Sequence, residues 1–325
     1  MADGTVSRSA WRFVLAAAVA IFAAGETGPA GAADHLRVGK PTPEAYDFAL
    51  LQVGIDAGIF EKHGLEIETI ALAGSAKLHQ ALIAGSIDIA MGAGTDFVFI
   101  AKGAPEKAIA AMAGPPNNMA VIVAAHGPVH AVADLKGKKI GVSTVGSLTY
   151  WLAQQLSRRQ GWGNDGMAIV PVGGMQGEAA GIIGGNLDAG VGSLEGGLSM
   201  ERKGAGKILL LFGDFVHPFL AHAIFASDTM MKARPEEIRR FLKAWFETVA
   251  FAKAHKAEAI RYSQSVTKLP PDEAAQVYDN ETPMFSTDGR FDPAAVAVVK
   301  RSLVEMGQVR SAPDDKTLFT EEFLN

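Results

Sequence analysis

Residues 64–96 read GLEIETIALAGSAKLHQALIAGSIDIAMGAGTD, and this stretch decides the fold. Leu65–Ile70 alternates apolar with charged or polar residues, which predicts a strand with one face in water. A helix is predicted to begin at Gly74-Ser75, with Ser75 as its N-cap. Ile87–Met91 then predicts a second strand, which ends in the small, polar loop Gly92–Asp96. The stretch is a strand–helix–strand unit whose last strand ends at open space.

The same order of elements recurs about one hundred residues later in the chain. Met167–Val172 predicts a strand, Gln176–Gly184 a helix, and Asn186–Val191 a further strand, and Lys138–Val142 predicts an earlier strand of the same unit. The turn Gly192–Glu195 corresponds to Gly92–Asp96. Alternating strands and helices are typical of α/β structure with largely parallel sheets, so we expect two similar α/β lobes, each a mostly parallel sheet flanked by helices.

The lobes are expected to be joined by two crossings. Gly114–Asn118, which contains two prolines, predicts a rigid first crossing, and residues 212–218 follow a predicted strand and suit the return. Helical patterns from Pro235 onward are expected to pack on the first lobe. We therefore predict that residues 33–114 and 217–325 form lobe 1 and that residues 115–216 form lobe 2.

The first 32 residues have the plan of a secretory signal peptide. Arg8 and Arg12 precede the apolar run Phe13–Ala24, and Ala30-Gly31-Ala32 resembles a cleavage site. As a helix the apolar run would span only about 18 Å, too short for a membrane core of roughly 30 Å. Cleavage is expected after Ala32.

Composition excludes several classes of function. The chain has 325 residues, a formal net charge of −5 without long runs of like charge, and no cysteine. Nothing in this balance indicates a nucleic-acid partner. Without cysteine there is no disulfide, thiolate metal site, cysteine nucleophile or lipidated cysteine anchor. We expect a soluble monomer in the periplasm that is not a lipoprotein.

Three further motifs resemble one protein family. They are GIFEKHGL at 58–65, ALIAGSID at 81–88, and LKGKKIGV at 135–142 followed by Gly146-Ser147. They resemble the periplasmic solute-binding proteins of ABC importers in the nitrate/sulfonate/taurine and thiamine-pyrimidine-precursor group. The resemblance covers essentially the whole mature chain. It implies a type II two-lobe fold that closes on a small solute and delivers it to a membrane permease, without identifying the solute.

Ligands of open α/β sheets bind beyond the carboxyl ends of the strands, so the loops at those ends are the candidate site. Gly146-Ser147, directly before a helix, is the first choice and Ser75 the second. The candidate ligand-binding residues in these loops and on the crossing are Thr42, Tyr46, Ser75, Thr95, Asp96, Thr144, Gly146, Ser147, Trp151, Glu195 and His217.

The charges in these loops favour two different kinds of ligand. Helix N-termini favour an anionic group. Asp96 and Glu195, in contrast, favour an amine, an amidine or a ring N–H, and no arginine is present to grip a carboxylate or sulfonate. Alternatively, Asp96 caps the helix at Phe97 and Glu195 lies solvated on a lobe rim.

Aromatic residues suit the walls of such a site. Tyr46, Trp151 and His217 are candidates for stacking on a planar ligand, although Trp151 equally suits the core and His217 a hinge. The remaining histidines lack the spacing of metal ligands. We expect no catalytic residue, no metal and no cofactor.

Two other functions remain open. One is an enzyme of the same fold acting on a pyrimidine or similar precursor, with Asp96 and Glu195 as an acid–base pair. However, the chain has no G-x-S-x-G, Walker or H-E-x-x-H motif. The other is a sensor lobe that reports the ligand to a receptor.

Overall fold

A computed structural model gives the structure of the protein and describes Met1 and residues 33–72 and 74–324. Residues 33–325 form one compact unit. Apart from Met1, the predicted signal peptide lies outside the described residues. None of the described helices combines the length and the apolar character that a membrane crossing requires.

The described residues form two five-stranded sheets. The strands of the first sheet are β1 (Asp34–Lys40), β2 (Leu65–Ala71), β3 (Ile89–Ala93), β4 (Glu106–Ala113) and β10 (His222–Ser227). The strands of the second sheet are β5 (Met119–Ala124), β6 (Lys139–Val142), β7 (Ala168–Pro171), β8 (Ala189–Ser193) and β9 (Gly206–Leu211). The predicted α/β fold with two lobes is confirmed, whereas the residue boundaries of the lobes stay a prediction.

The two sheets have the same topology. The strand order is β2-β1-β3-β10-β4 in the first and β7-β6-β8-β5-β9 in the second. The register also repeats, since Val38 pairs with Ile89 in one sheet and Ile140 pairs with Ala189 in the other. The similarity of the two units predicted from the sequence is therefore present in the backbone.

One strand of each sheet runs against its neighbours, and neither had been predicted. β10 is antiparallel to β3 and β4, and β5 is antiparallel to β8 and β9. Each is the first strand after the chain passes from one sheet to the other, through residues 114–118 and 212–221. The chain thus enters each sheet between two strands of that sheet.

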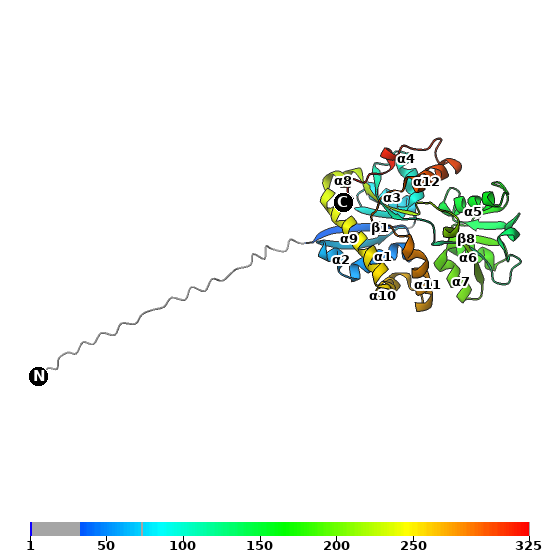
Figure 1. The fold of residues 1–325 in the computed structure, drawn as a ribbon, viewed down its shortest axis with the longest axis horizontal. Coiled ribbons are helices and arrows are strands. Elements are labelled where there is room, and N and C mark those ends of the chain that lie inside the picture. The colour runs from blue at the N-terminus through cyan, green and yellow to red at the C-terminus, as the bar shows by residue number, and fades with distance from the viewer. Residues whose placement is uncertain (2–32, 73, 325) are drawn as a thin grey trace. The chain divides into compact units, whose positions relative to one another are not determined.

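Helices cover the sheets (Figure 1). Those in the first part of the chain are α1 (Tyr46–Asp56), α2 (Ile59–Lys62), α3 (Ser75–Ile83) and α4 (Phe97–Ala101), with the 3-10 turn η1 (Gly94–Asp96). Those associated with the second sheet are η2 (Val132–Leu135), α5 (Leu148–Arg159), α6 (Met175–Ile183), α7 (Leu194–Arg202) and η3 (Phe212–Asp214). The C-terminal ones are α8 (Asp228–Ala233), α9 (Pro235–Ala254), α10 (Lys256–Thr267), α11 (Pro271–Glu281), η4 (Thr282–Met284), α12 (Pro293–Glu305) and α13 (Asp315–Leu318).

Helices α3 and α6 begin at equivalent glycines. Gly74 and Gly174 are the N-caps, with φ angles of 89° and 113°. Because only glycine adopts such angles without strain, these two turns require it. The expectation that Ser75 caps α3 is therefore wrong: Ser75 is the first helical residue, and no side chain caps α3.

The C-terminal helices pack on the first sheet's own helices. Figure 1 shows α9, α10 and α11, in yellow to orange, beside the blue α1 and α2, and these helices are in contact. The apolar stripe of α9 is buried, as its spacing predicted, and consists of Ile238, Phe241, Leu242, Trp245, Val249 and Ala252. Burying this stripe removes apolar surface from water and fixes α1 and α11 in place for the site.

Candidate functional site

Three carboxylates from distant parts of the chain converge where elements of the two sheets meet. Asp47, Glu195 and Glu281 each offer one oxygen, and these oxygens lie within 4.8 Å of one another. Asp47 is in the first turn of α1, Glu195 is in the first turn of α7, and Glu281 ends α11. Helices α1 and α7 follow the carboxyl ends of β1 and β8, the predicted location of a ligand. We refer to these three residues as the acidic cluster.

Glu195 links the two sheets' helices directly. Its Oε1 accepts the backbone N–H of Tyr46 at 3.0 Å. Tyr46 is the first residue of α1, and the N-cap residue Ala45 makes no side-chain capping bond. A carboxylate from α7 thus occupies the N-terminus of α1, which attracts negative charge.

Asp47 is held by two buried polar residues at the ends of the crossings. His222 Nε2 lies 2.8 Å from Asp47 Oδ2, and the amide of Asn118 donates to the same oxygen at 3.0 Å. Asn118 directly precedes β5, and His222 begins β10. The two crossings between the sheets therefore meet at one side of the acidic cluster.

Glu281 has no such partners. The residue is 0% exposed, and neither carboxyl oxygen has a hydrogen-bond partner among the residues that the structure describes. Burial, together with the nearby Glu195 and Asp47, raises the pKa of Glu281 well above its ordinary value. An unpaired buried carboxyl group is unfavourable and would be stabilised by a positive charge or a hydrogen-bond donor.

The pKa of Glu195 is also raised, although less than that of Glu281. Burial and the charge of Asp47 raise the pKa of Glu195 to about 6, although the bond from the Tyr46 N–H opposes the rise. Two of the three carboxyl groups are therefore shifted toward their neutral forms. The arrangement suits a ligand that brings positive charge or N–H groups.

Among the predicted residues, Glu195 and Tyr46 are the two that the structure brings to the acidic cluster. Tyr46 takes part through its backbone. Its ring is 1% exposed, lies edge-on to Tyr278 and Phe285, and its hydroxyl bonds Thr282 Oγ1 at 2.8 Å. The ring therefore belongs to the core and not to the wall of a site.

Asp96 lies in a different buried cluster. Its Oδ2 accepts the Ala93 N–H at 2.9 Å and lies 3.1 Å from His79 Nε2, and His79 Nδ1 lies 2.9 Å from Glu106 Oε1. The side chain neither caps the helix at Phe97 nor joins Glu195. The acid–base pair of the enzyme alternative, Asp96 with Glu195, is therefore not formed, because the buried Asp96 carboxylate contacts His79 instead. Thr95 is buried beside it.

The loop before α5 is held by hydrogen bonds between its own residues, and Gln308 of the C-terminal segment lies against it. Ser147 is the N-cap of α5 and accepts the Tyr150 N–H at 3.2 Å. Its hydroxyl donates to the carbonyl of Thr144, whose side chain is exposed. Gly146 has a φ of 81°, and a side chain there would collide with Gln308. These contacts serve the fold, and a ligand role for the three residues stays a prediction.

Trp151 packs in the core. It is 1% exposed, stacks on Phe219 at 5.0 Å, and donates its indole N–H to Glu305 of α12 at 2.9 Å. This packing favours the core alternative over stacking on a ligand. Thr42 and His217 are exposed.

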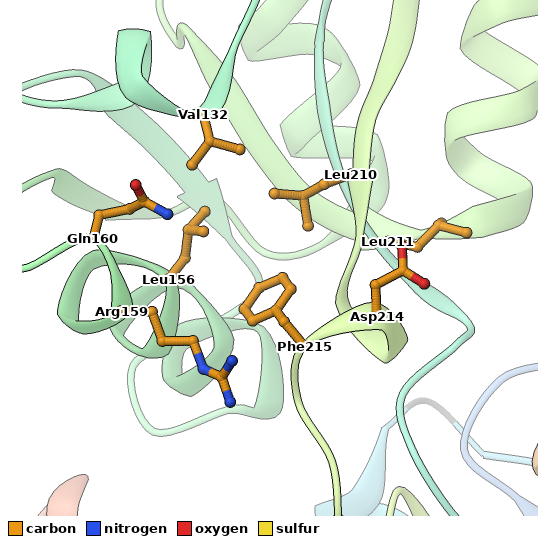
Figure 2. Close-up of a pocket in the computed structure, with 8 residues that line it drawn as sticks. All are labelled: Val132, Leu156, Arg159, Gln160, Leu210, Leu211, Asp214 and Phe215. Carbon is orange, nitrogen blue, oxygen red and sulfur yellow. The ribbon is translucent and has the colours of Figure 1, made fainter.

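A cavity among the described residues lies elsewhere, beside the edge strand β9 (Figure 2). It measures about 510 Å³ and is lined by Val132, Leu156, Arg159, Gln160, Leu210, Leu211, Asp214 and Phe215. None of the predicted site residues lines it. Its walls are mainly apolar and come from one sheet's elements, so the acidic cluster is the better candidate for the site.

Three residues in or beside the acidic cluster were not predicted from the sequence. Asp47 directly follows the candidate Tyr46 in the sequence but was not singled out. Glu281 ends an ordinary amphipathic helix, and His222 begins a strand that had not been predicted. What unites them is tertiary structure, which a single sequence does not display.

Comparisons with known proteins identify a family. The family model described as "NMT1/THI5 like" matches residues 45–259. No curated protein matches the chain.

Solved structures share the fold. The alkanesulfonate-binding protein SsuA from Xanthomonas axonopodis pv. citri, bound to MOPS, has a TM-score of 0.70 and 18% identity over 86% of this chain and 94% of its own. A zinc-bound ligand-binding component of an ABC-type import system from Staphylococcus aureus has a TM-score of 0.76 and 13% identity over 89% and 97%. The desulfurization enzyme DSZB has a TM-score of 0.64 and 16% identity over 89% and 97%.

Proposed function

We propose a role in solute uptake for this chain, which belongs to the NMT1/THI5-like family. The protein is the solute-binding component of an ABC importer. It captures a small solute between its two lobes and delivers it to a membrane permease. Its lobes comprise residues 33–114 with 217–325, and residues 115–216.

The observation that carries this proposal is the position of the acidic cluster. Asp47 and Glu195 stand at the carboxyl ends of strands in different sheets, and Glu195 bonds the Tyr46 backbone. A solute that contacts both residues would stabilise the state in which the lobes are together. Capture by lobe closure follows from such a site without any chemical step.

The charge of the cluster indicates which solutes fit. SsuA was solved with MOPS, and helix N-termini suit such anions. In this chain the N-terminus of α1 is taken by Glu195, and Glu281 adds a buried carboxyl group. A cationic or N–H-bearing solute therefore suits the cluster better than a sulfonate.

The expected location and partners follow from the same role. A cleavable signal peptide would deliver the protein to the periplasm, and the absence of cysteine leaves no lipid attachment site in the sequence. We propose a soluble monomer that docks on an ABC permease of the inner membrane.

No chemical step is assigned to the protein, although DSZB shares its fold. The enzyme alternative pairs Asp96 with Glu195, but Asp96 is bonded to His79 instead. A purified protein that turns over its solute would overturn the proposal in favour of an enzyme.

A thermal-shift screen tests the proposal. Sulfonates, aromatic acids, amines, pyrimidines and metal salts are added to the full chain and the unfolding temperature is measured. A solute at one hundred times its dissociation constant adds about 2.7 kcal/mol to the free energy of unfolding. We expect stabilisation by a cationic or N–H-bearing solute, and a smaller radius of gyration in solution scattering. A screen in which no solute stabilises the protein would contradict the role.

A further inference from the structure

We propose that the acidic cluster binds a divalent metal ion, held by Asp47, Glu195 and Glu281, and that this ion is the solute on which the lobes close. The inference rests on the proposed function, because it names the substrate class of the same site. It departs from the expectation of no metal, which relied on the spacing of histidines along the sequence.

The geometry of the three oxygens suits one ion. Three atoms no more than 4.8 Å apart all lie within about 2.8 Å of a common centre (4.8 Å divided by the square root of three). Divalent metals take carboxylate oxygens at about 2.0–2.6 Å. Small movements of the side chains would bring all three oxygens to bonding distance.

Glu281 gives the second observation that points to a ligand. It is fully buried, its two oxygens have no partner, and one of them is a member of the cluster. Buried polar atoms in proteins are nearly always paired, so an orphan carboxyl group requires an explanation. A bound cation supplies one, because it would pair the carboxyl group that the protein itself leaves without a partner.

The balance of charge favours a dication over an ammonium group. Asp47 already contacts His222 and Asn118, whereas Glu281 has no hydrogen-bond partner and Glu195 is bonded to a neutral backbone N–H. All three carboxylates can coordinate one dication at once, whereas a monovalent ammonium group would offset the charge of only one of them.

The donor set narrows the choice of metal. It consists of carboxylate oxygens from three residues, without a thiolate in the chain. Calcium takes six to eight oxygen ligands and magnesium retains several waters. Carboxylate oxygens suit Mn²⁺, and Zn²⁺ also accepts them at about 2.0–2.2 Å, so these two ions are the probes used.

The test measures metal binding to the full chain with ZnCl₂ and MnCl₂, by titration calorimetry and native mass spectrometry. We expect one tightly bound ion per chain. Glu281→Gln, nearly isosteric, should weaken binding by more than about a hundredfold, since changing even the outer partners of metal ligands costs 10–100-fold. Asp279→Asn is the matched control, because Asp279 lies on the same helix with its side chain 58% exposed. It should leave the affinity unchanged.

The other outcomes separate this inference from the proposed function. If neither metal binds but an amine or pyrimidine does, and Glu281→Gln abolishes that binding, the metal is wrong and the solute-binding role stands. If neither a metal nor any solute binds, both are wrong. Equal losses in the Asp279→Asn and Glu281→Gln proteins would indicate binding to surface carboxylates and would overturn the metal site. Circular dichroism and unfolding temperature confirm that each variant is folded.

Discussion

The carboxylate of Glu195 accepts the backbone N–H of Tyr46 at 3.0 Å, so a side chain of α7 caps helix α1. The two helices follow strands of different sheets. This bond therefore joins the two lobes at the position where a solute is expected, and it places negative charge at a helix N-terminus.

Replacing Glu195 by alanine should loosen the contact between the lobes. The loss of a capping acceptor costs roughly 1 kcal/mol, and the radius of gyration measured by solution scattering without solute should increase. Glu195→Gln is the control, because its amide oxygen can still accept the Tyr46 N–H. Equal radii for the alanine variant and the parent protein would show that this bond does not hold the lobes together.

Glu195→Gln has a separate effect on the choice of solute. The substitution removes the charge and keeps the shape of the side chain. It should therefore weaken the binding of a cationic or N–H-bearing ligand far more than the binding of an anionic one. Calorimetric titration of the parent and the variant measures the difference. An unaltered affinity for a cationic ligand would place Glu195 on the rim, outside the binding site.

Replacing Glu281 by methionine should stabilise the solute-free protein. The variant keeps a side chain of similar length and removes a buried carboxyl group whose oxygens have no partner. Removing the cost of burying this unpaired carboxyl group should add about 1–3 kcal/mol to the free energy of unfolding. Urea unfolding measures this value, and the same variant should lose its solute. A destabilised variant would mean that Glu281 is paired in the solute-free state.

Because of His79, the free energy of unfolding should decrease as the pH rises into the alkaline range. Burial opposes its charge, but the bonds to Asp96 and Glu106 outweigh burial and raise the pKa of His79 to about 9. Because this pKa lies above the unfolded value of 6.5, the stabilisation is complete below pH 6.5 and is lost as the pH rises through about 9. The shift corresponds to on the order of 3 kcal/mol.

Two measurements check this prediction. Urea unfolding between pH 6.5 and pH 10 gives the slope, and an NMR titration of the His79 ring gives its pKa in the folded protein. Glu106→Gln removes one of the two carboxylates and should lower that pKa. A ring that titrates near 6.5 in the parent protein would contradict the prediction.

Glu178 should lower stability at neutral and alkaline pH. This residue of α6 occupies the position equivalent to Leu78 of α3, is 3% exposed, and has an unpartnered Oε2. Burial raises its pKa to about 8. Stability therefore falls as the pH rises from the unfolded value of 4.5 through about 8, by on the order of a few kcal/mol. Glu178→Gln should flatten that decline in urea unfolding, and an unchanged pH profile would argue against a raised pKa.

The parallel part of each sheet could be predicted from the sequence because local signals mark it. Alternation at Leu65–Ile70 and the polar turns after strands locate β2 and β3 in the first sheet and β6 and β8 in the second. The reversed strands lack such signals. Met119–Ala124 is a short apolar run directly after a crossing, and a run of this kind does not reveal its direction or its partners.

The candidate site was predicted only in part for a similar reason. Glu195 follows a strand end, so the general rule for α/β sheets finds it. Asp96 obeys the same rule and yet turns toward His79, because the partner of a buried side chain is decided by packing. No local sequence pattern predicts that Glu281 belongs to the site, since it is the packing of α11 against α1 that brings it to Asp47.

The reversed strands also constrain the order in which the chain can fold. All five strands of the second sheet lie within residues 119–211, so a continuous segment contains everything this sheet needs. The first sheet is different, because β4 pairs with β10 and β10 lies beyond that segment. During synthesis or export, β4 therefore lacks its partner strand until residues 222–227 emerge, whereas every strand of the second sheet is available by then. Strand β10 also carries His222, so of the two buried partners of Asp47, Asn118 is synthesised first and His222 only with this last strand.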